Sequence, residues 1–167
     1  MEKNTTGQNF LKEIEMEAVA TRKCLEKIPE SLYDYKPHEK SMVMRNLVAV
    51  VTEIPKWLEA IAEIGEINFT TWEKYNPMTT EDNLKHFDEN MESARKALQN
   101  VSDETLEKMF YLKYGEKVLM EGKRGDNISW NINHLVHHRG QLTVYMRLNN
   151  IPVPAIYGPS ADENTFK

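Results

Sequence analysis

The sequence predicts an all-α four-helix bundle that forms a single domain over residues 1–167. Four long segments carry apolar residues at intervals of three and four, the spacing that places side chains on one face of a helix. Hydrophobic residues make up 40% of the chain and charged residues 28%, which is ordinary usage for a globular domain. Since few segments alternate as strands do, packing four amphipathic helices together is the simplest way to bury their apolar faces.

Charge and composition exclude several classes of partner. The net charge is −5 and no stripe of lysine and arginine is present, which argues against a nucleic-acid partner. No apolar run approaches the roughly 18 residues that suggest a membrane span, and the first six residues contain no apolar stretch of the signal-peptide type. The single cysteine, Cys24, cannot form an internal disulfide. We therefore expect a cytoplasmic protein that contacts neither a membrane nor nucleic acid.

The first two helices are expected over residues 6–28 and 42–64. Pro29 ends the first, because a proline disfavours helical geometry in the residue before it. Ser41 is a suitable cap for the second. Pro55 lies inside the second pattern, where it removes a backbone hydrogen bond and is expected to kink the helix.

Residues 66–79 are expected to form a loop that contains three aromatic side chains, Phe69, Trp72 and Tyr75. Aromatic residues in a loop usually hold it against the body of the protein, which is the reading we favour. The alternative is that they line the mouth of a pocket.

The second half of the chain predicts two more helices. The third begins at Thr79 or Thr80, where acidic residues suit the first turn, and ends near Asn100. Residues 105–123 favour a small hairpin, with a short helical turn as the competing interpretation. The last helix is expected over residues 126–149, and an extended tail follows from about residue 151.

The last predicted helix carries the densest chemistry of the chain. His134 and His138 are four residues apart, so on a helix their rings lie on one face about one turn apart. Two neutral imidazoles in this arrangement can bind one divalent ion, although a secure site needs further ligands. Gln141 and Tyr145 continue the same face and are candidates to bind a water or a substrate. His137 is offset by roughly 100° of helix rotation and need not be a ligand.

The sequence resembles the DinB family of DNA-damage-inducible bundle proteins, whose relatives include thiol-dependent transferases that use bacillithiol or mycothiol. The resemblance spans nearly the whole chain and is most specific at its C-terminal end. The segments that carry it are 133–142, 145–147, 153–154 and 157–163 near the C-terminus, 36–42 before the second helix, and 87–91 with 94–98 in the third.

The resemblance implies a four-helix bundle, commonly a homodimer, that holds a divalent metal, zinc or nickel, with three histidines. Two of these map onto His134 and His138. The third family histidine lies in the second helix, and the matching position here is Val50, whose aliphatic side chain cannot donate to a metal. The resemblance therefore implies a metal-dependent thiol transferase or hydrolase whose metal site lacks one family ligand.

Three explanations of Val50 remain open from the sequence. The site is lost or weakened, which leaves a metal-free, non-catalytic binding or scaffold bundle related to stress. Alternatively Glu53, one turn further on, supplies a carboxylate ligand. The third explanation is that His38 or His86 reaches the site from elsewhere in the fold.

Two further residues have a structural and a functional interpretation. Arg139 is expected to form a salt bridge or a hydrogen bond to the C-terminal tail, and the functional alternative is that it binds an anionic group of a substrate. Cys24 lies beside the apolar face of the first helix and is expected to be a half-buried structural thiol. The functional alternative is a nucleophile, which would need a nearby base or cation.

Overall fold

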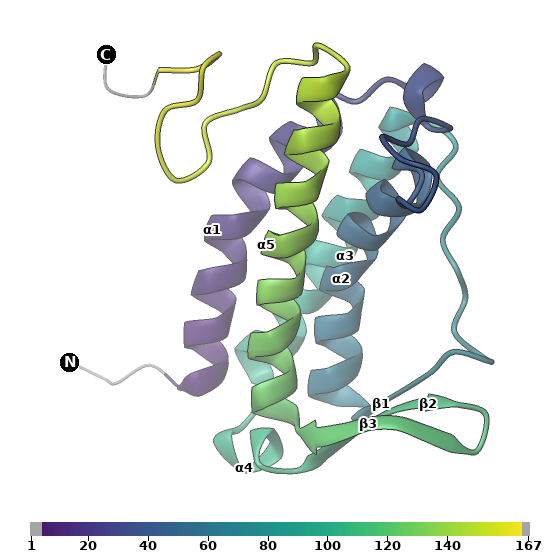
Figure 1. Ribbon diagram of the computed structural model, residues 1–167. Coiled ribbons are helices and arrows are strands. Elements are labelled where there is room, and N and C mark those ends of the chain that lie inside the picture. The colour runs from purple at the N-terminus through teal and green to yellow at the C-terminus, as the bar shows by residue number, and fades with distance from the viewer. Residues whose placement is uncertain (1–4, 165–167) are drawn as a thin grey trace.

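The computed structural model describes residues 5–164, and its four long helices form a bundle (Figure 1). The helices are α1 (Thr6–Glu26), α2 (Met44–Glu63), α3 (Thr80–Asn100) and α5 (Arg124–Leu148). Shorter elements are the 3-10 helix η1 (Glu30–Leu32), the one-turn helix α4 (Asp103–Leu106) and the strands β1 (Glu66–Asn68), β2 (Met109–Tyr114) and β3 (Lys117–Lys123). The predicted all-α bundle with an insert before the last helix is thereby confirmed. Residues 1–4, most of the segment inspected for a signal peptide, lie outside the described residues.

The four helices are arranged in the order α1, α3, α2, α5 around one apolar core. α2 packs against both α3 and α5, and α1 also packs against both of these helices. All four contribute fully buried side chains, among them Ile14, Leu58, Phe87 and Leu135. In the described part of the chain, no helix combines the length and apolar character that crossing a bilayer requires.

The helix starts follow local hydrogen-bonding rules. Thr5 and Gln8 form a reciprocal capping box at the start of α1, and the Thr79 side chain accepts a hydrogen bond from the backbone of Asp82 in α3. The prediction that Ser41 caps the second helix was wrong. α2 begins at Met44, and the residue at its cap position, Val43, makes no side-chain capping bond.

α2 continues through Pro55, which is buried within it. The helix ends as predicted before Gly65, which has a φ of +82°. A side chain at this position would be strained, because L-residues disfavour this conformation, and an added Cβ would lie 2.1 Å from the Arg124 guanidinium, which would have to move. That guanidinium donates hydrogen bonds to the carbonyls of Ala62 and Ile64, so it caps the C-terminal end of α2.

A three-stranded sheet closes the lower end of the bundle in the order β1-β2-β3 (Figure 1). β2 and β3 form the predicted hairpin, with a register shift between Leu112 and Lys113, and α4 supplies the helical turn that was its competing interpretation. The expectation of an uninterrupted loop over residues 66–79 needs correction, because β1 pairs in parallel with β2. This pairing joins the end of α2 to a segment more than forty residues later in the chain.

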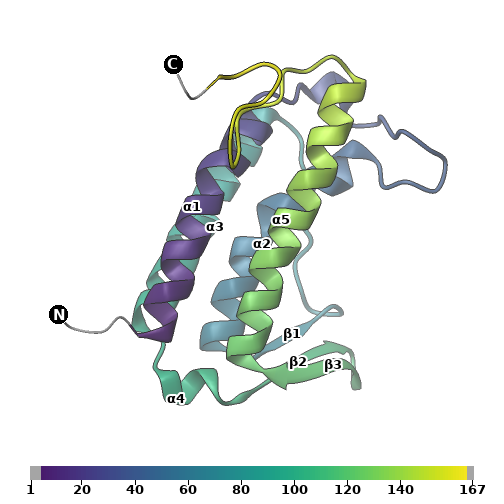
Figure 2. The same cartoon turned by 60° about the vertical axis from the view of Figure 1, so that its left-hand side comes forward.

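The C-terminal tail folds back over α1 and α5, and Figure 2 shows it in yellow beside the upper part of α1. Arg147 of α5 pairs with Asp162, and Lys27 at the end of α1 pairs with Glu163 at 3.0 Å. Hydrogen bonds lower the pKa of both carboxyl groups. For Asp162 the main cause is the bond from Arg147. For Glu163 the main cause is the backbone bond from Ala155, followed by the bond from Lys27. The tail is therefore held at both helices.

Candidate functional site

The two histidines of α5 converge as their spacing predicts. The Nε2 atoms of His134 and His138 lie 2.7 Å apart, and both side chains are half-buried. Two Nε2 atoms bound to one tetrahedral zinc at about 2.05 Å each would lie roughly 3.3 Å apart. The pair is thus in hydrogen-bond contact, and a small rotation of the rings would open it to the separation that a shared ion needs.

The hydrogen-bond partners define the tautomer of His138. Its Nδ1 lies 2.7 Å from the side-chain oxygen of Gln141, which can only accept, so His138 donates from Nδ1. In the neutral ring this leaves the Nε2 lone pair free, and it accepts from His134 Nε2 in the absence of an ion. Metal-binding histidines usually donate their second ring nitrogen to such a partner, which fixes the ring orientation. Gln141 therefore orients one of the two candidate ligands.

Burial keeps both imidazoles neutral. Loss of solvent lowers the pKa of His134 from 6.5 to about 4, with smaller contributions from the nearby charges of His138 and His137. Burial also lowers the pKa of His138, partly opposed by its bond to Gln141. Metal ions bind only the neutral imidazole, so protons do not compete for His134 at pH 7.

Two indole rings lie beside His134. The ring centroids of Trp130 and Trp57 lie 4.8 Å and 6.1 Å from that of His134. His134 Nδ1 is buried and has no hydrogen-bond partner among the described residues. One of the two candidate ligands therefore has a satisfied second nitrogen and the other does not.

Val50, the position that matches the third family histidine, is half-buried against the apolar core. Within residues 5–164, no group of three or more His, Cys, Asp or Glu side chains is placed to hold a metal ion. The donor set is therefore two histidines, one fewer than a catalytic zinc site usually has, and any further coordination positions would fall to water or to a substrate.

Glu53 and His86, two of the alternative ligands, bind each other. Glu53 is buried, with Oε1 2.6 Å from His86 Nε2, and Oε2 accepts from the Trp72 indole at 3.2 Å. Tyr75 stacks on the His86 ring with centroids 3.9 Å apart and donates to Asn83. Both oxygens of the carboxylate are thus occupied, and the aromatic residues Trp72 and Tyr75 hold their loop to the bundle as favoured from the sequence.

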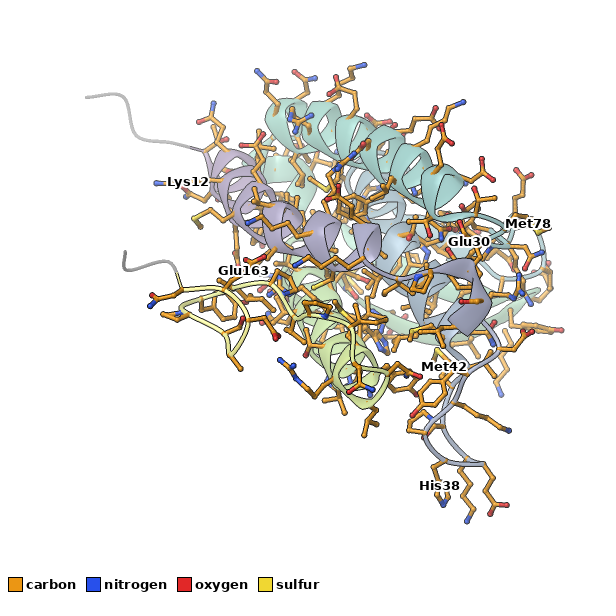
Figure 3. The ribbon with its side chains drawn as sticks, turned by 90° about the horizontal axis from the view of Figure 1, so that it is seen from above. Lys12, Glu30, His38, Met42, Met78 and Glu163 are labelled. Carbon is orange, nitrogen blue, oxygen red and sulfur yellow. The ribbon has the colours of Figure 1, made fainter. Side chains whose placement is uncertain are left out.

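His38, the remaining alternative ligand, lies at the tip of a loop that projects from the bundle (Figure 3). Its Nδ1 accepts from the backbone of Lys40, and its side chain is exposed. The structure therefore does not bring His38 to the histidine pair.

Arg139 and Tyr145 face the interior and not the histidine pair. Arg139 is 1% exposed, and its guanidinium lies 2.6 Å from the Glu17 carboxylate and donates to the Thr21 and Tyr157 hydroxyls. This is the expected salt bridge, together with the expected bond to the tail. The Tyr145 hydroxyl donates to the Met42 carbonyl at 2.8 Å. Of the three predicted substrate-binding residues, only Gln141 contacts the pair.

Cys24 is fully buried in the core, and not half-buried as expected from its position beside the apolar face. Burial raises the pKa of its thiol from 9.0 to about 11, so the thiolate form is scarce at neutral pH. The chain accordingly offers no activated cysteine of its own.

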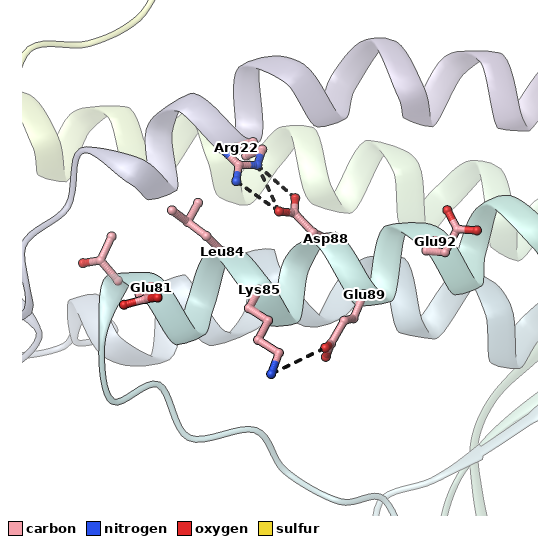
Figure 4. A pocket seen from close by; sticks show the side chains of 8 residues that line it. Arg22, Glu81, Leu84, Lys85, Asp88, Glu89 and Glu92 are labelled. Atoms are coloured by element: carbon pink, nitrogen blue, oxygen red, sulfur yellow. Dashed lines mark hydrogen bonds and ion pairs between the residues drawn. The ribbon is translucent and has the colours of Figure 1, made fainter.

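A broad depression of about 760 Å³ lies elsewhere, along α3 (Figure 4). Its charged side chains are largely paired with one another, as in Arg22 with Asp88 and Lys85 with Glu89. It is wide open to solvent and no residue of α5 lines it, so it adds nothing to the candidate site.

Trp57 and Trp130 lie beside His134 and were not among the site residues predicted from the sequence. Trp57 lies on α2 and Trp130 on α5, and no local spacing relates the two residues. A signal was nonetheless present, since Trp130 precedes His134 by four residues and shares its helix face.

The fold and the site define a class of mainly helical bundle proteins with a small sheet before the last helix and a histidine pair on that helix. Comparison with known proteins places the chain more closely: the DinB family matches residues 1–165, and the chain belongs to the DinB family. Among curated proteins, the uncharacterized protein YrdA of Bacillus subtilis (strain 168) is 49% identical over 39 residues, which is 23% of each chain.

Solved structures with the same fold are also DinB-like proteins. One, YjoA from Bacillus subtilis, has a TM-score of 0.68 and 22% identity, covering 87% of this chain and 96% of the other. Another, from Bacillus cereus, has a TM-score of 0.66 and 20% identity, covering 90% and 97%. These likenesses establish the mainly helical fold with its small sheet before the last helix.

Proposed function

We propose that this protein binds one divalent metal ion, zinc or nickel, through His134 and His138, and that it acts as a thiol transferase or hydrolase on a small molecule. The observation that carries the proposal is the convergence of two neutral imidazole Nε2 atoms on α5. The low pKa of His134 and the bond from His138 to Gln141 both favour the ligand form of these rings.

The bound ion would act as a Lewis acid that lowers the pKa of a coordinated water or cosubstrate thiol. The residues of the chain have supporting roles. His134 and His138 remain neutral and supply their lone pairs, while Gln141 fixes the ring of His138. Cys24 is buried with a raised pKa, so the nucleophile comes from a small-molecule thiol or from water.

Metal titration tests this proposal. Protein purified without a nickel column and stripped with EDTA is titrated with ZnCl₂ and NiCl₂ by calorimetry. We expect one ion per chain, and we expect His134→Ala to weaken binding at least tenfold because it removes one of two protein ligands. His137→Ala is the matched control, since His137 is an exposed neighbour whose ring lies beside His138. Wild-type protein that binds neither ion would refute the catalytic proposal.

The second candidate function is a metal-free, non-catalytic binding or scaffold bundle, and Val50 is the observation that favours it. Val50→His decides between the two. If wild-type protein binds no metal and this variant binds tightly, the native site has lost its function and the second candidate holds. If wild-type protein binds metal tightly and His134→Ala abolishes that binding, the second candidate function is refuted.

A further inference from the structure

A small apolar pocket lies beside His134, where α2, α5 and the sheet meet. Its volume is about 200 Å³, and carbon atoms form nearly all of its exposed lining. Four aromatic side chains contribute to the wall, together with Leu112 of β2: Trp57, Phe69, Phe110 and Trp130. The aromatic residue Phe69 of the 66–79 loop thus lines a pocket, the alternative that the sequence left open.

The size and shape of the wall select a flat, apolar group. An apolar cavity of about 150 Å³ in another protein holds benzene, so about 200 Å³ accommodates one ring with a small substituent. Trp57 lies at a tilted angle to Phe69 with centroids 6.0 Å apart, and Trp130 is tilted against His134 at 4.8 Å. Rings in such orientations offer both faces and edges, and a further aromatic ring packs favourably against either.

Two of the residues that line the pocket, Trp57 and His134, also hold a buried polar atom. Trp57 Nε1 and His134 Nδ1 have no hydrogen-bond partner among the described residues. Neither atom exposes surface to the pocket, so the carbon lining alone selects the ligand.

We propose that this pocket binds a single aromatic ring that bears at most one small substituent. The assignment to a reaction rests on the proposed function: because His134 lies in the wall, the ring would belong to the electrophilic substrate whose reactive atom faces the histidine pair. The binding itself depends only on the wall and does not require a metal.

Fluorine NMR with 4-fluorobenzyl alcohol as the probe tests the proposal on the full chain. We expect a saturable shift of the probe signal with a Kd on the order of 1 mM, as suits so small a ligand. Leu112→Trp adds an indole to the pocket and should raise the Kd at least tenfold. Leu119→Trp adds the same ring to the exposed side of the same hairpin and should leave the Kd within twofold.

Circular dichroism melting checks that each variant folds, and Met120→Trp, which fills the same pocket, replaces Leu112→Trp if that variant does not. The pocket proposal is overturned if wild-type protein gives no saturable shift, or if the pocket-filling and control variants bind the probe equally. His138→Ala separates the two proposals, because it removes a metal ligand and leaves the pocket wall intact. If this variant loses metal binding and still binds the probe, both proposals are supported. If it loses metal binding and probe binding together, the proposal of a metal-independent pocket is overturned.

Discussion

Replacing Arg139 by methionine should destabilise the protein strongly while leaving metal binding intact. The guanidinium and the Glu17 carboxylate lie 2.6 Å apart, with side chains only 2% and 12% exposed. Removing one partner of a buried ion pair leaves the other charge uncompensated, which costs about 3–5 kcal/mol. We expect a loss near 3 kcal/mol in the free energy of unfolding, the lower end of this range, because the Tyr157 hydroxyl still donates to Glu17.

Urea denaturation followed by circular dichroism measures this loss. The matched control is Arg22→Met, which breaks the Arg22–Asp88 pair on α1 and α3. That pair has a similar distance of 2.9 Å, but its side chains are 44% and 48% exposed, so we expect a loss below about 1 kcal/mol. The double variant Glu17→Leu with Arg139→Met should recover part of the stability, because no unpaired charge remains buried.

Two results would contradict this reasoning. Equal losses for Arg139→Met and Arg22→Met would mean that burial does not set the strength of the pair. Unchanged stability together with altered metal or substrate binding would mean that Arg139 acts at the site and not in the core.

Four further predictions can be tested, three from the described contacts and one from the family resemblance. Because burial raises the pKa of Cys24 to about 11, a thiol reagent such as DTNB should react with native protein at least a hundredfold more slowly than with urea-unfolded protein; equal rates would refute its burial. The folded pKa of His134, about 4, lies below its unfolded value of 6.5, so the unfolded state takes up the additional proton as the pH falls. Stability in EDTA should therefore drop by about 2 kcal/mol between pH 6.5 and pH 4, and His134→Gln should remove this component. Glu53→Leu should release Trp72 and speed proteolysis of the 66–79 loop severalfold, and an unchanged cleavage rate would show that the loop is held by other contacts. Finally, the homodimer expected from the family resemblance predicts a mass of twice 19.5 kDa by light scattering at micromolar concentration, and a monomer would refute it.

The sequence predicted the parts of the fold that local physics determines. Apolar periodicity placed all four long helices within a few residues of their observed ends, and the spacing of His134 and His138 placed their rings together. Thr79 and Gly65 marked helix boundaries because capping and a positive φ are local requirements. Each of these features depends on residues within about one helical turn.

What the sequence left open depends on contacts between distant segments. β1 is only three residues long, and it is a strand because β2 pairs with it. Arg139 meets Glu17 across 122 positions, and Glu53 meets His86 across 33. Two of the suggested metal ligands, Glu53 and His86, are committed to one another by a tertiary contact that no local pattern encodes.

The parallel pairing of β1 with β2 also determines when the pocket beside His134 comes into existence. Three separate segments of the chain form its wall. They come together only when β1, which follows α2, pairs with β2, which follows α3 and α4. The unfolded chain has no such pocket, so a compound that binds there would stabilise only the native state. Thermal shift measurements across a collection of small aromatic compounds would exploit this, since each genuine occupant should raise the melting temperature in proportion to the logarithm of its concentration above Kd.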